Sequence, residues 1–377
     1  MELHFSVPCL FGLEGLCADE LRRMKLSNVK AENGKVHFTG AESDIAKANI
    51  NIRTGERVLI TAGETNANSF DELFEGVRAI PWENYIPADG SFPVKGHSLG
   101  SKLHSIPDCQ KIIKKATAER LKAGHKTNLL NETAAKYQIQ FAIMDDIATL
   151  YIDTTGAGLH KRGYRPAGND APLRETLAAA IVKLSRYRGR ELVCDPFCGS
   201  GTIPIEAALA AINRAPGLNR SFAAEQWEWL DKNIWSGAKE EAVSHEYRGD
   251  YHIRGGDIDP KCIEISKENA GRAGVSDYIR FERADASGFI KKIQNEAESI
   301  TENGIIMTNP PYGERVMQKS EAENLYRDFG AAAKSLKNWK MYILSSHTEF
   351  ERTFGKTAAK KRKLYNGMIK CDLFMYY

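Results

Sequence analysis

Residues 191–311 repeat one pattern, in which a short apolar run is followed by a turn and then by a stretch with helical spacing of its apolar residues. The apolar runs fall at 191–197, 251–257, 278–285 and 304–311, with helix-like stretches at 203–212 and 260–271. Short strands that are apolar throughout are typical of a parallel sheet covered by helices on both faces. The pattern therefore predicts a doubly wound α/β sheet, which further apolar runs at 340–346 and 370–377 would complete.

The first 155 residues follow a different order. Strand-like runs at 4–9 and 35–40 alternate with amphipathic stretches at 13–24 and 43–54, which indicates a small α+β unit. Four more strand-like runs, at 57–65, 91–98, 137–144 and 147–154, accompany an amphipathic helix at 107–124. A chain of 377 residues exceeds what one core usually serves. We expect an N-terminal unit over 1–65, a second over 66–155, a Gly- and Pro-rich connector over 156–170 and the doubly wound domain over 171–377.

Composition excludes several classes of protein. No stretch approaches the run of about 18 apolar residues that would predict a membrane span, and the first residues lack the pattern of a secretory signal. The seven cysteines are scattered without paired spacing, which is typical of reduced thiols in a cytosol. Cys194 and Cys198 have no second Cys/His pair at zinc-site spacing. We expect a cytoplasmic protein that binds neither a membrane nor a metal.

Positive charge is concentrated locally, although the net charge is only +3. Eight Lys/Arg lie between Lys95 and Lys126, and nine lie between Lys334 and Lys363. Such stretches can follow a phosphate backbone, although solvated helix faces would give the same pattern. The candidate contacts to nucleic acid are Lys102, Lys111, Lys114 and Lys115, and, in the connector, Lys161, Arg162 and Arg165.

A glycine-rich turn and strand-end acids indicate a nucleoside-binding site. The octapeptide Asp195–Thr202 (DPFCGSGT) joins a strand to a helix, and its glycines let a ligand approach the backbone closely. Asp257 ends the next strand and could bind ribose hydroxyls, whereas Asp259, before Pro260, fits a helix N-cap. Asp285 ends a third strand and could accept a hydrogen bond from an adenine amine. Asp257 follows the glycines by far more than the roughly 20 residues of a simple dinucleotide fold, and no P-loop lysine follows them.

The strand-like run 304–308 leads directly into Asn309-Pro310-Pro311-Tyr312. Two prolines remove two backbone donors and stiffen the turn, so that the Asn309 side-chain oxygen and the Pro310 carbonyl can point outward as acceptors. Two acceptors that hold the N–H groups of an exocyclic base amine would aim its lone pair at an electrophilic methyl group. Tyr312 could stack on an extruded base. The motif thus predicts methylation of a base amine, unless the turn serves structure alone.

Together with TNPPYGER (308–315), the octapeptide closely resembles the motifs of class I methyltransferases that modify exocyclic amines. Their fold is a Rossmann-like sheet with a reversed seventh strand. GHSLGSK (96–102), the lysine-rich helix after it and IATLYIDTTGAGLHKRGYR (147–165) are similar to a THUMP domain, which a ferredoxin-like unit would precede. Nearly the whole chain resembles the THUMP-containing RNA guanine-N2 methyltransferases, notably the N-terminal half of the bacterial 23S rRNA enzyme.

This resemblance implies S-adenosylmethionine as the methyl donor and assigns the site. The cofactor contacts would be Asp195, Pro196, Cys198, Gly199, Gly201, Thr202, Asp257, Ile258, Asp285, Ala286 and Asn309. The base contacts would be Asn309, Pro310, Pro311 and Tyr312, and Arg315 could meet a phosphate. The implied activity is methylation of a guanine N2 amine in 23S rRNA. Transfer RNA, DNA adenine-N6 methylation and a non-catalytic RNA-binding assembly factor remain alternatives, and the sequence specifies neither the target nucleotide nor the oligomeric state.

Overall fold

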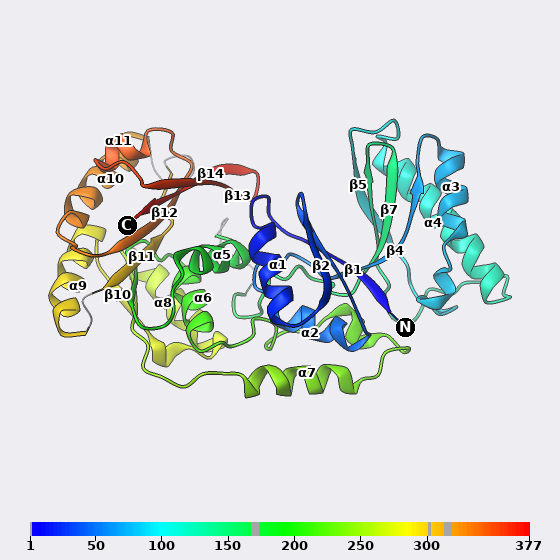
Figure 1. Ribbon diagram of the computed structural model, residues 1–377, viewed down its shortest axis with the longest axis horizontal. Coiled ribbons are helices and arrows are strands. Elements are labelled where there is room, and N and C mark those ends of the chain that lie inside the picture. The colour runs from blue at the N-terminus through cyan, green and yellow to red at the C-terminus, as the bar shows by residue number, and fades with distance from the viewer. Residues whose placement is uncertain (1, 167–172, 301–302, 313–318) are drawn as a thin grey trace. The chain divides into compact units, whose positions relative to one another are not determined.

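The computed structural model describes residues 2–166, 173–300, 303–312 and 319–377 (Figure 1). They form two compact units, and each has a seven-stranded sheet. Unit 1 comprises Met1–Cys9, Cys17–Leu159 and Ser221–Glu240, and unit 2 comprises Leu10–Leu16, His160–Arg220 and Glu241–Tyr377. The chain therefore passes between the units more than once. In particular, Ser221–Glu240 groups with unit 1, although the sequence placed it in the doubly wound domain.

Unit 1 is built on one continuous sheet with the strand order β2-β3-β1-β4-β7-β6-β5. Its elements are β1 (Leu3–Pro8), α1 (Glu14–Arg23), β2 (Ser27–Glu32), β3 (Lys35–Gly40), α2 (Ser43–Asn51), β4 (Leu59–Asn66), α3 (Phe70–Ala79), β5 (Val94–Leu99), α4 (Ile106–Gly124), β6 (Ile139–Met144) and β7 (Ile147–Asp153). Strand β4 pairs antiparallel with both β1 and β7. It crosses the border expected at residue 65, so the two α+β parts share a sheet.

Helix α4 is amphipathic, as the sequence predicts. Ile113, Ala116 and Leu121 are buried, whereas Lys111 and Lys115 are exposed. Figure 1 shows α3 and α4 on the same side of strands β5 and β7. Within the described ranges, no helix combines the length and apolar content needed to cross a membrane.

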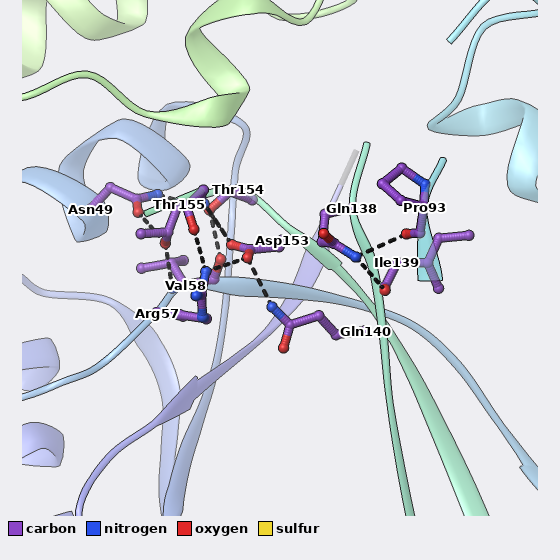
Figure 2. Close-up of polar contacts among 11 residues, drawn as sticks. Asn49, Arg57, Val58, Pro93, Gln138, Ile139, Gln140, Asp153, Thr154 and Thr155 are labelled. Carbon is purple, nitrogen blue, oxygen red and sulfur yellow. Dashed lines mark hydrogen bonds and ion pairs between the residues drawn. The ribbon is translucent and has the colours of Figure 1, made fainter. Parts of the chain in front are cut away.

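A buried polar network ties α2 to the end of β7 (Figure 2). The Asn49 amide donates to Thr154 Oγ1 at 2.8 Å and accepts from Thr155 Oγ1 at 2.6 Å. Each threonine hydroxyl also bonds the backbone of Val58, and Asp153 pairs with Arg57. Because buried polar groups are costly unless bonded, the segment Asp153–Thr155 serves the architecture of unit 1.

The tryptophan-rich segment Ser221–Glu240 is anchored within unit 1. The Trp227 indole N–H donates to the Lys136 carbonyl at 3.0 Å, and its ring stacks on Tyr137 with centroids 4.9 Å apart. Trp229 stacks on Trp227 in turn. A fully buried tryptophan contributes several kcal/mol of packing. This segment of the chain is thus an integral part of the N-terminal core.

Unit 2 has the expected doubly wound sheet, with the order β10-β9-β8-β11-β12-β14-β13. Its strands are β8 (Leu192–Asp195), β9 (Ile253–Asp257), β10 (Ile279–Arg283), β11 (Gly304–Thr308), β12 (Lys340–Ser345), β13 (Lys360–Asn366) and β14 (Ile369–Tyr376). Strands β8 to β12 pair in parallel, and β14 runs antiparallel between β12 and β13. This is the predicted reversed seventh strand.

Helices cover both faces of this sheet. The helices are α5 (Glu175–Ser185), α6 (Thr202–Ala211), α8 (Pro260–Ala273), α9 (Ala286–Ile300), α10 (Lys319–Ala333) and α11 (Phe350–Phe354). A further helix, α7 (Asn233–Ser244), begins in unit 1 and ends in unit 2. Ile305 and Met307 pack into the core beneath α5, α6 and α8, whereas Ile306 packs into the core beneath α9, α10 and α11. The alternation along β11 explains why the strand is apolar throughout.

Candidate active site

The glycine-rich turn lies between β8 and α6, in unit 2. Gly199 and Gly201 have φ angles of +51° and +81°, which favour glycine. A Cβ at Gly201 would lie 2.9 Å from the Cβ of Ser266, so only glycine fits at this position without a shift of its neighbours. A Cβ at Gly199 would meet no described atom within 4 Å. The backbone of Gly199 therefore borders open space, where a ligand can approach it.

Asp257 is held against this turn. Its Oδ2 accepts from the Gly199 N–H at 2.9 Å, and its Oδ1 accepts from the Asp259 N–H at 3.0 Å. Each carboxylate oxygen has two lone pairs and can accept a further hydroxyl. Asp259 accepts from Lys261 N–H and caps α8, as the sequence predicts. Ile258, beside Asp257, is 67% exposed and offers an apolar surface at the same edge.

Asp285 and Ala286 lie at the start of α9, after β10. Asp285 is exposed, and its Oδ1 accepts from the Gly288 N–H at 2.9 Å, so it caps this helix. Ala286 is buried. Strand β10 pairs with β9 in register up to Arg283 and Asp257, which brings both strand ends to one edge of the sheet. The sequence predicted that the Asp285 carboxylate accepts a hydrogen bond from an adenine amine. Its Oδ1 already accepts the capping bond, which leaves fewer lone pairs for such an amine.

Asp195 is buried at the end of β8 and bonds Thr308 of β11. The Thr308 hydroxyl donates to Asp195 Oδ1 at 2.6 Å, and the Phe197 N–H donates to the same oxygen at 3.1 Å. Burial raises the pKa of the Asp195 carboxyl to about 7, although both hydrogen bonds oppose the shift. Pro196, Cys198 and Thr202, the other expected cofactor contacts in this turn, are buried around it.

The tetrapeptide Asn309–Tyr312 follows β11 directly. The Tyr312 hydroxyl donates to Asn309 Oδ1, so the acceptor that the sequence left open is occupied by the neighbouring phenol. The Cys371 thiol lies 3.7 Å from the same hydroxyl, and the Tyr326 hydroxyl donates to the Pro311 carbonyl at 2.5 Å. Burial raises the pKa of Tyr312 well above its ordinary value, so the phenol stays protonated. Asn309 Oδ1 keeps a second lone pair for a base amine while Tyr312 donates to the first.

The connector differs from the expectation that its arginines contact RNA. Arg162 is 3% exposed and pairs with buried Glu206 at 3.4 Å. Arg165 pairs with Glu175 at 2.6 Å and donates to Thr202 of the glycine turn. A guanidinium group that is paired and buried, as in Arg162, or paired and mostly buried, as in Arg165, has little left to offer a phosphate. Both arginines instead fix the connector to unit 2, whereas Lys161 is exposed. Residues 167–170 of the connector and Arg315 lie outside the described ranges.

The lysines expected to bind RNA in unit 1 are exposed or half-buried. Lys102 bonds the Asn68 side chain at 2.9 Å and lies 3.6 Å from Asp146. On α4, Lys111 lies near Asp108, and Lys114 pairs with Glu132 at 2.7 Å. Lys115 lies over the ring of Phe74. The contacts of Lys114 limit its availability more than those of exposed Lys111 and Lys115.

Three residues that hold the site were not singled out from the sequence. Thr308 bonds Asp195, Tyr326 bonds the Pro311 carbonyl, and Asn269 donates to the Ser200 carbonyl of the glycine turn at 3.0 Å. Only Thr308 carried a signal, because it directly precedes the tetrapeptide. Across the described part of the chain, no three His, Cys, Asp or Glu side chains are grouped to hold a metal ion.

Three family models match the chain in succession. Residues 4–59 match the RlmL ferredoxin-like domain, 67–153 the THUMP domain and 162–374 the RMKL-like methyltransferase domain. The last match alone covers more than half of the chain. The fold of both units and the order of the three domain types agree with the resemblance read from the sequence.

Two relatives align over almost the whole chain. A Bacillus subtilis protein named provisionally as an RNA methyltransferase, YpsC, is 42% identical over 97% of this chain and 94% of its own length. The ribosomal RNA large subunit methyltransferase K/L of Psychromonas ingrahamii is 35% identical over 99% of this chain. The chain spans 50% of that K/L relative, about half its length.

Solved structures share the complete fold. A Listeria monocytogenes protein described as a predicted N6-adenine-specific DNA methylase has a TM-score of 0.93 at 44% identity, covering 100% of this chain and 96% of that one. A protein described provisionally as a methyltransferase, complexed with SAH, has a TM-score of 0.92 at 38% identity, covering 100% and 98%.

Proposed function

The chain belongs to the RMKL-like family of S-adenosylmethionine-dependent RNA methyltransferases, and from this premise we propose that it methylates the N2 amine of a guanine in 23S rRNA. The observation that carries the proposal is the meeting of two motifs at one sheet edge. The cofactor turn after β8 and the tetrapeptide after β11 follow adjacent parallel strands. Parallel sheets bind ligands at the carboxyl ends of such strands.

The residues of the turn suit a nucleoside sulfonium cofactor, which supplies an electrophilic methyl group. We assign the methionine part to the turn, where Gly199 borders open space and the Asp195 carboxylate can accept from an ammonium group. Each carboxylate oxygen of Asp257 accepts one backbone hydrogen bond and keeps a second lone pair, which can accept from a ribose hydroxyl. Ile258 and Ala286 would contact the adenine, with Asp285 accepting from its amine.

At the target base, Asn309 and Pro310 would each accept one N–H of the guanine amine. Two acceptors favour a pyramidal nitrogen and aim its lone pair, so catalysis rests on positioning and electrostatics. Tyr312 donates to one lone pair of Asn309 Oδ1 and leaves the other for the amine, and its ring would stack on the base. The methylated nitrogen sheds its proton afterwards, which requires no side chain of matched pKa. This agrees with a Tyr312 phenol whose pKa is raised.

The grip on RNA is proposed for unit 1. The THUMP match covers β5 to β7 and α4, where exposed Lys111 and Lys115 can meet phosphates. The K/L relatives support ribosomal RNA as the substrate, and their activity is proposed here only for the half that this chain spans. We place the reaction in the cytoplasm. We assign RNA binding to residues 1–155 and methyl transfer to residues 171–377.

Two other substrates remain candidates. Transfer RNA would use the same chemistry and the same THUMP grip. The description of the Listeria protein favours DNA adenine-N6 methylation, for which an Asn-Pro-Pro-Tyr motif is equally suited. A non-catalytic assembly factor is disfavoured, because a scaffold needs no paired acceptors beside an aromatic ring.

The test is transfer of labelled methyl from S-adenosylmethionine to total rRNA, total tRNA and duplex DNA, followed by nucleoside mass spectrometry. The proposal expects N2-methylguanosine in large-subunit rRNA. The same nucleoside in tRNA alone would show that tRNA is the substrate and would support methylation of a guanine N2 amine. N6-methyladenine in DNA would refute the proposal.

A further inference from the structure

The hairpin formed by β13 and β14 has two chemically different faces. Directly paired residues of antiparallel strands share a face, and successive residues alternate between faces. Leu364 pairs with Cys371, and both are buried in the core of unit 2. Tyr365 pairs with Lys370 on the opposite face, and both are exposed. Near its turn the hairpin therefore joins the core on one side and meets solvent on the other. Farther from the turn, Phe374 on that second side packs into the other core of unit 2.

The inner face of the hairpin borders the catalytic tetrapeptide. The Cys371 thiol lies 3.7 Å from the Tyr312 hydroxyl, and the Asn366 side chain hydrogen-bonds the same residue. Any nucleotide that reaches Asn309 must therefore come close to this hairpin. RNA that runs from the site past the turn at Gly367 and Met368 would reach the outer face of the hairpin.

The outer face carries cations beside an aromatic ring. Lys363 and Lys370 are exposed, Tyr365 is 37% exposed, and Met368 at the turn is 99% exposed. Within the described residues, no ion pair is made by Lys363 or Lys370, and the acidic residue nearest in register is Asp372, opposite Lys363.

Other cations of β13 serve the fold. Lys361 pairs with Glu351 at 2.7 Å, and Arg362 donates to the Gly12 carbonyl at 2.5 Å. Lysines on an edge strand such as β13 also discourage aggregation. An exposed tyrosine and an exposed methionine at the same place would work against that purpose, which favours a binding role.

We propose that the outer face of this hairpin, formed by Lys363, Tyr365, Met368 and Lys370, binds unpaired RNA next to the target guanine. The lysines would contact phosphates, and Tyr365 would stack on a base. We take the RNA here to be single-stranded because sequence-specific recognition of RNA mostly targets loops, bulges and ends, where a guanine can enter the site without leaving a helix. The inference rests on the proposed function, and it assigns a second RNA contact, in unit 2, beside the site itself.

The test measures binding of the full chain to a protein-free 23S rRNA transcript at several salt concentrations. Lys363→Ala/Lys370→Ala should lower the slope of log affinity against log salt by about 1.4, or roughly 0.7 per phosphate contact with a single strand. Tyr365→Ala should weaken binding about tenfold without changing that slope, and Tyr365→Phe should restore it. Affinity for SAH should match the parent protein throughout.

Lys334→Ala/Lys337→Ala is the matched control. These lysines belong to the same basic stretch and are exposed, but they precede β12, whose Lys340 is level with Ile305 at the far end of β11 from Asn309. The control variant should keep the parent slope and affinity. Parent-like binding by the hairpin variant would overturn the inference while leaving methylation by the parent protein intact. A parent protein that neither binds nor methylates rRNA would overturn the proposed function and the inference together.

Discussion

Thr308 donates a 2.6 Å hydrogen bond to Asp195 between two buried strands, and this bond joins the two halves of the candidate active site. Thr308 directly precedes the tetrapeptide that would hold the base, and Asp195 opens the turn that would hold the cofactor. Both side chains are buried, at 0% and 1% exposure. A hydrogen bond shielded in this way is stronger than one in water, and its loss leaves a buried acceptor short of a partner.

Replacing Thr308 with valine should weaken cofactor use. Valine keeps the shape but not the hydroxyl, so KM for S-adenosylmethionine should rise about tenfold, as expected for a bond to a charged group. The hydroxyl lowers the pKa of Asp195, so its removal should move the acid limb of the kcat/KM profile to higher pH. Thr308→Ser should restore both. A pH profile that does not move would show that the bond serves packing alone.

Asp195→Asn should stabilise the cofactor-free protein at pH 8. Burial raises the pKa of Asp195 from 3.8 to about 7, so the folded state holds this proton more tightly than the unfolded state. Stability is then lost as pH rises from about 4 to about 7, and the loss is complete above that range. Asparagine is neutral at every pH and can keep both bonds to its oxygen. Thermal midpoints should therefore differ by a few degrees at pH 8, and the difference should shrink as pH falls and vanish below about pH 4. Affinity for SAH should fall in the variant. Equal midpoints at pH 8 would contradict the raised pKa.

Tyr312 substitutions separate the ring from the hydroxyl. Tyr312→Phe keeps a ring for stacking and releases Asn309, so kcat should equal or exceed that of the parent protein. Tyr312→Ala should lower kcat/KM for RNA by roughly tenfold or more, because base stacking is lost. Steady-state kinetics on rRNA measures both. An inactive Tyr312→Phe enzyme would mean that the hydroxyl, rather than the ring, acts in the reaction.

Asn49 supports the sheet of unit 1 from a buried position. Asn49→Ala removes partners of Thr154 and Thr155 and should cost about 2–3 kcal/mol of unfolding free energy. Asn51→Ala is the control, because Asn51 lies on the same helix and its side-chain amide donates to the Lys47 carbonyl one turn back, outside the network. Urea denaturation of both variants measures the difference. Equal losses would contradict the structural role of the network.

The sequence predicted unit 2 better than unit 1. Apolar runs such as Gly304–Thr308 identify buried parallel strands. Because helices cover both faces of the sheet, the side chains on both faces of such a strand are buried. The turn glycines and Asp257 were recognisable for a similar local reason, since each ends a strand. In unit 1, no local pattern shows that β4 joins two α+β parts in one sheet, because strand pairing between distant segments is a tertiary property.

The sequence did not predict which side chains pair with one another in the folded chain. Arg162 and Arg165 look like RNA contacts in a basic connector, yet Glu206 and Glu175 pair with them in the folded chain. The segment Ser221–Glu240 follows α6 in sequence but packs with unit 1. Deleting residues 1–155 would therefore remove the packing partners of Trp227 as well as the proposed RNA-binding surface. Point substitutions therefore test more cleanly which unit binds RNA.

In the proposed reaction, Asn309 carries methyl transfer to a guanine N2 amine of 23S rRNA. Its most direct test is the N2-methylguanosine content of large-subunit rRNA from cells that lack this protein, with the parent chain or the Asn309→Ala variant returned. We expect one modified guanosine to disappear in these cells, to return with the parent chain and to stay absent with Asn309→Ala, although this variant still binds SAH. Full methylation by Asn309→Ala, or rRNA unchanged by the loss of the protein, would contradict it.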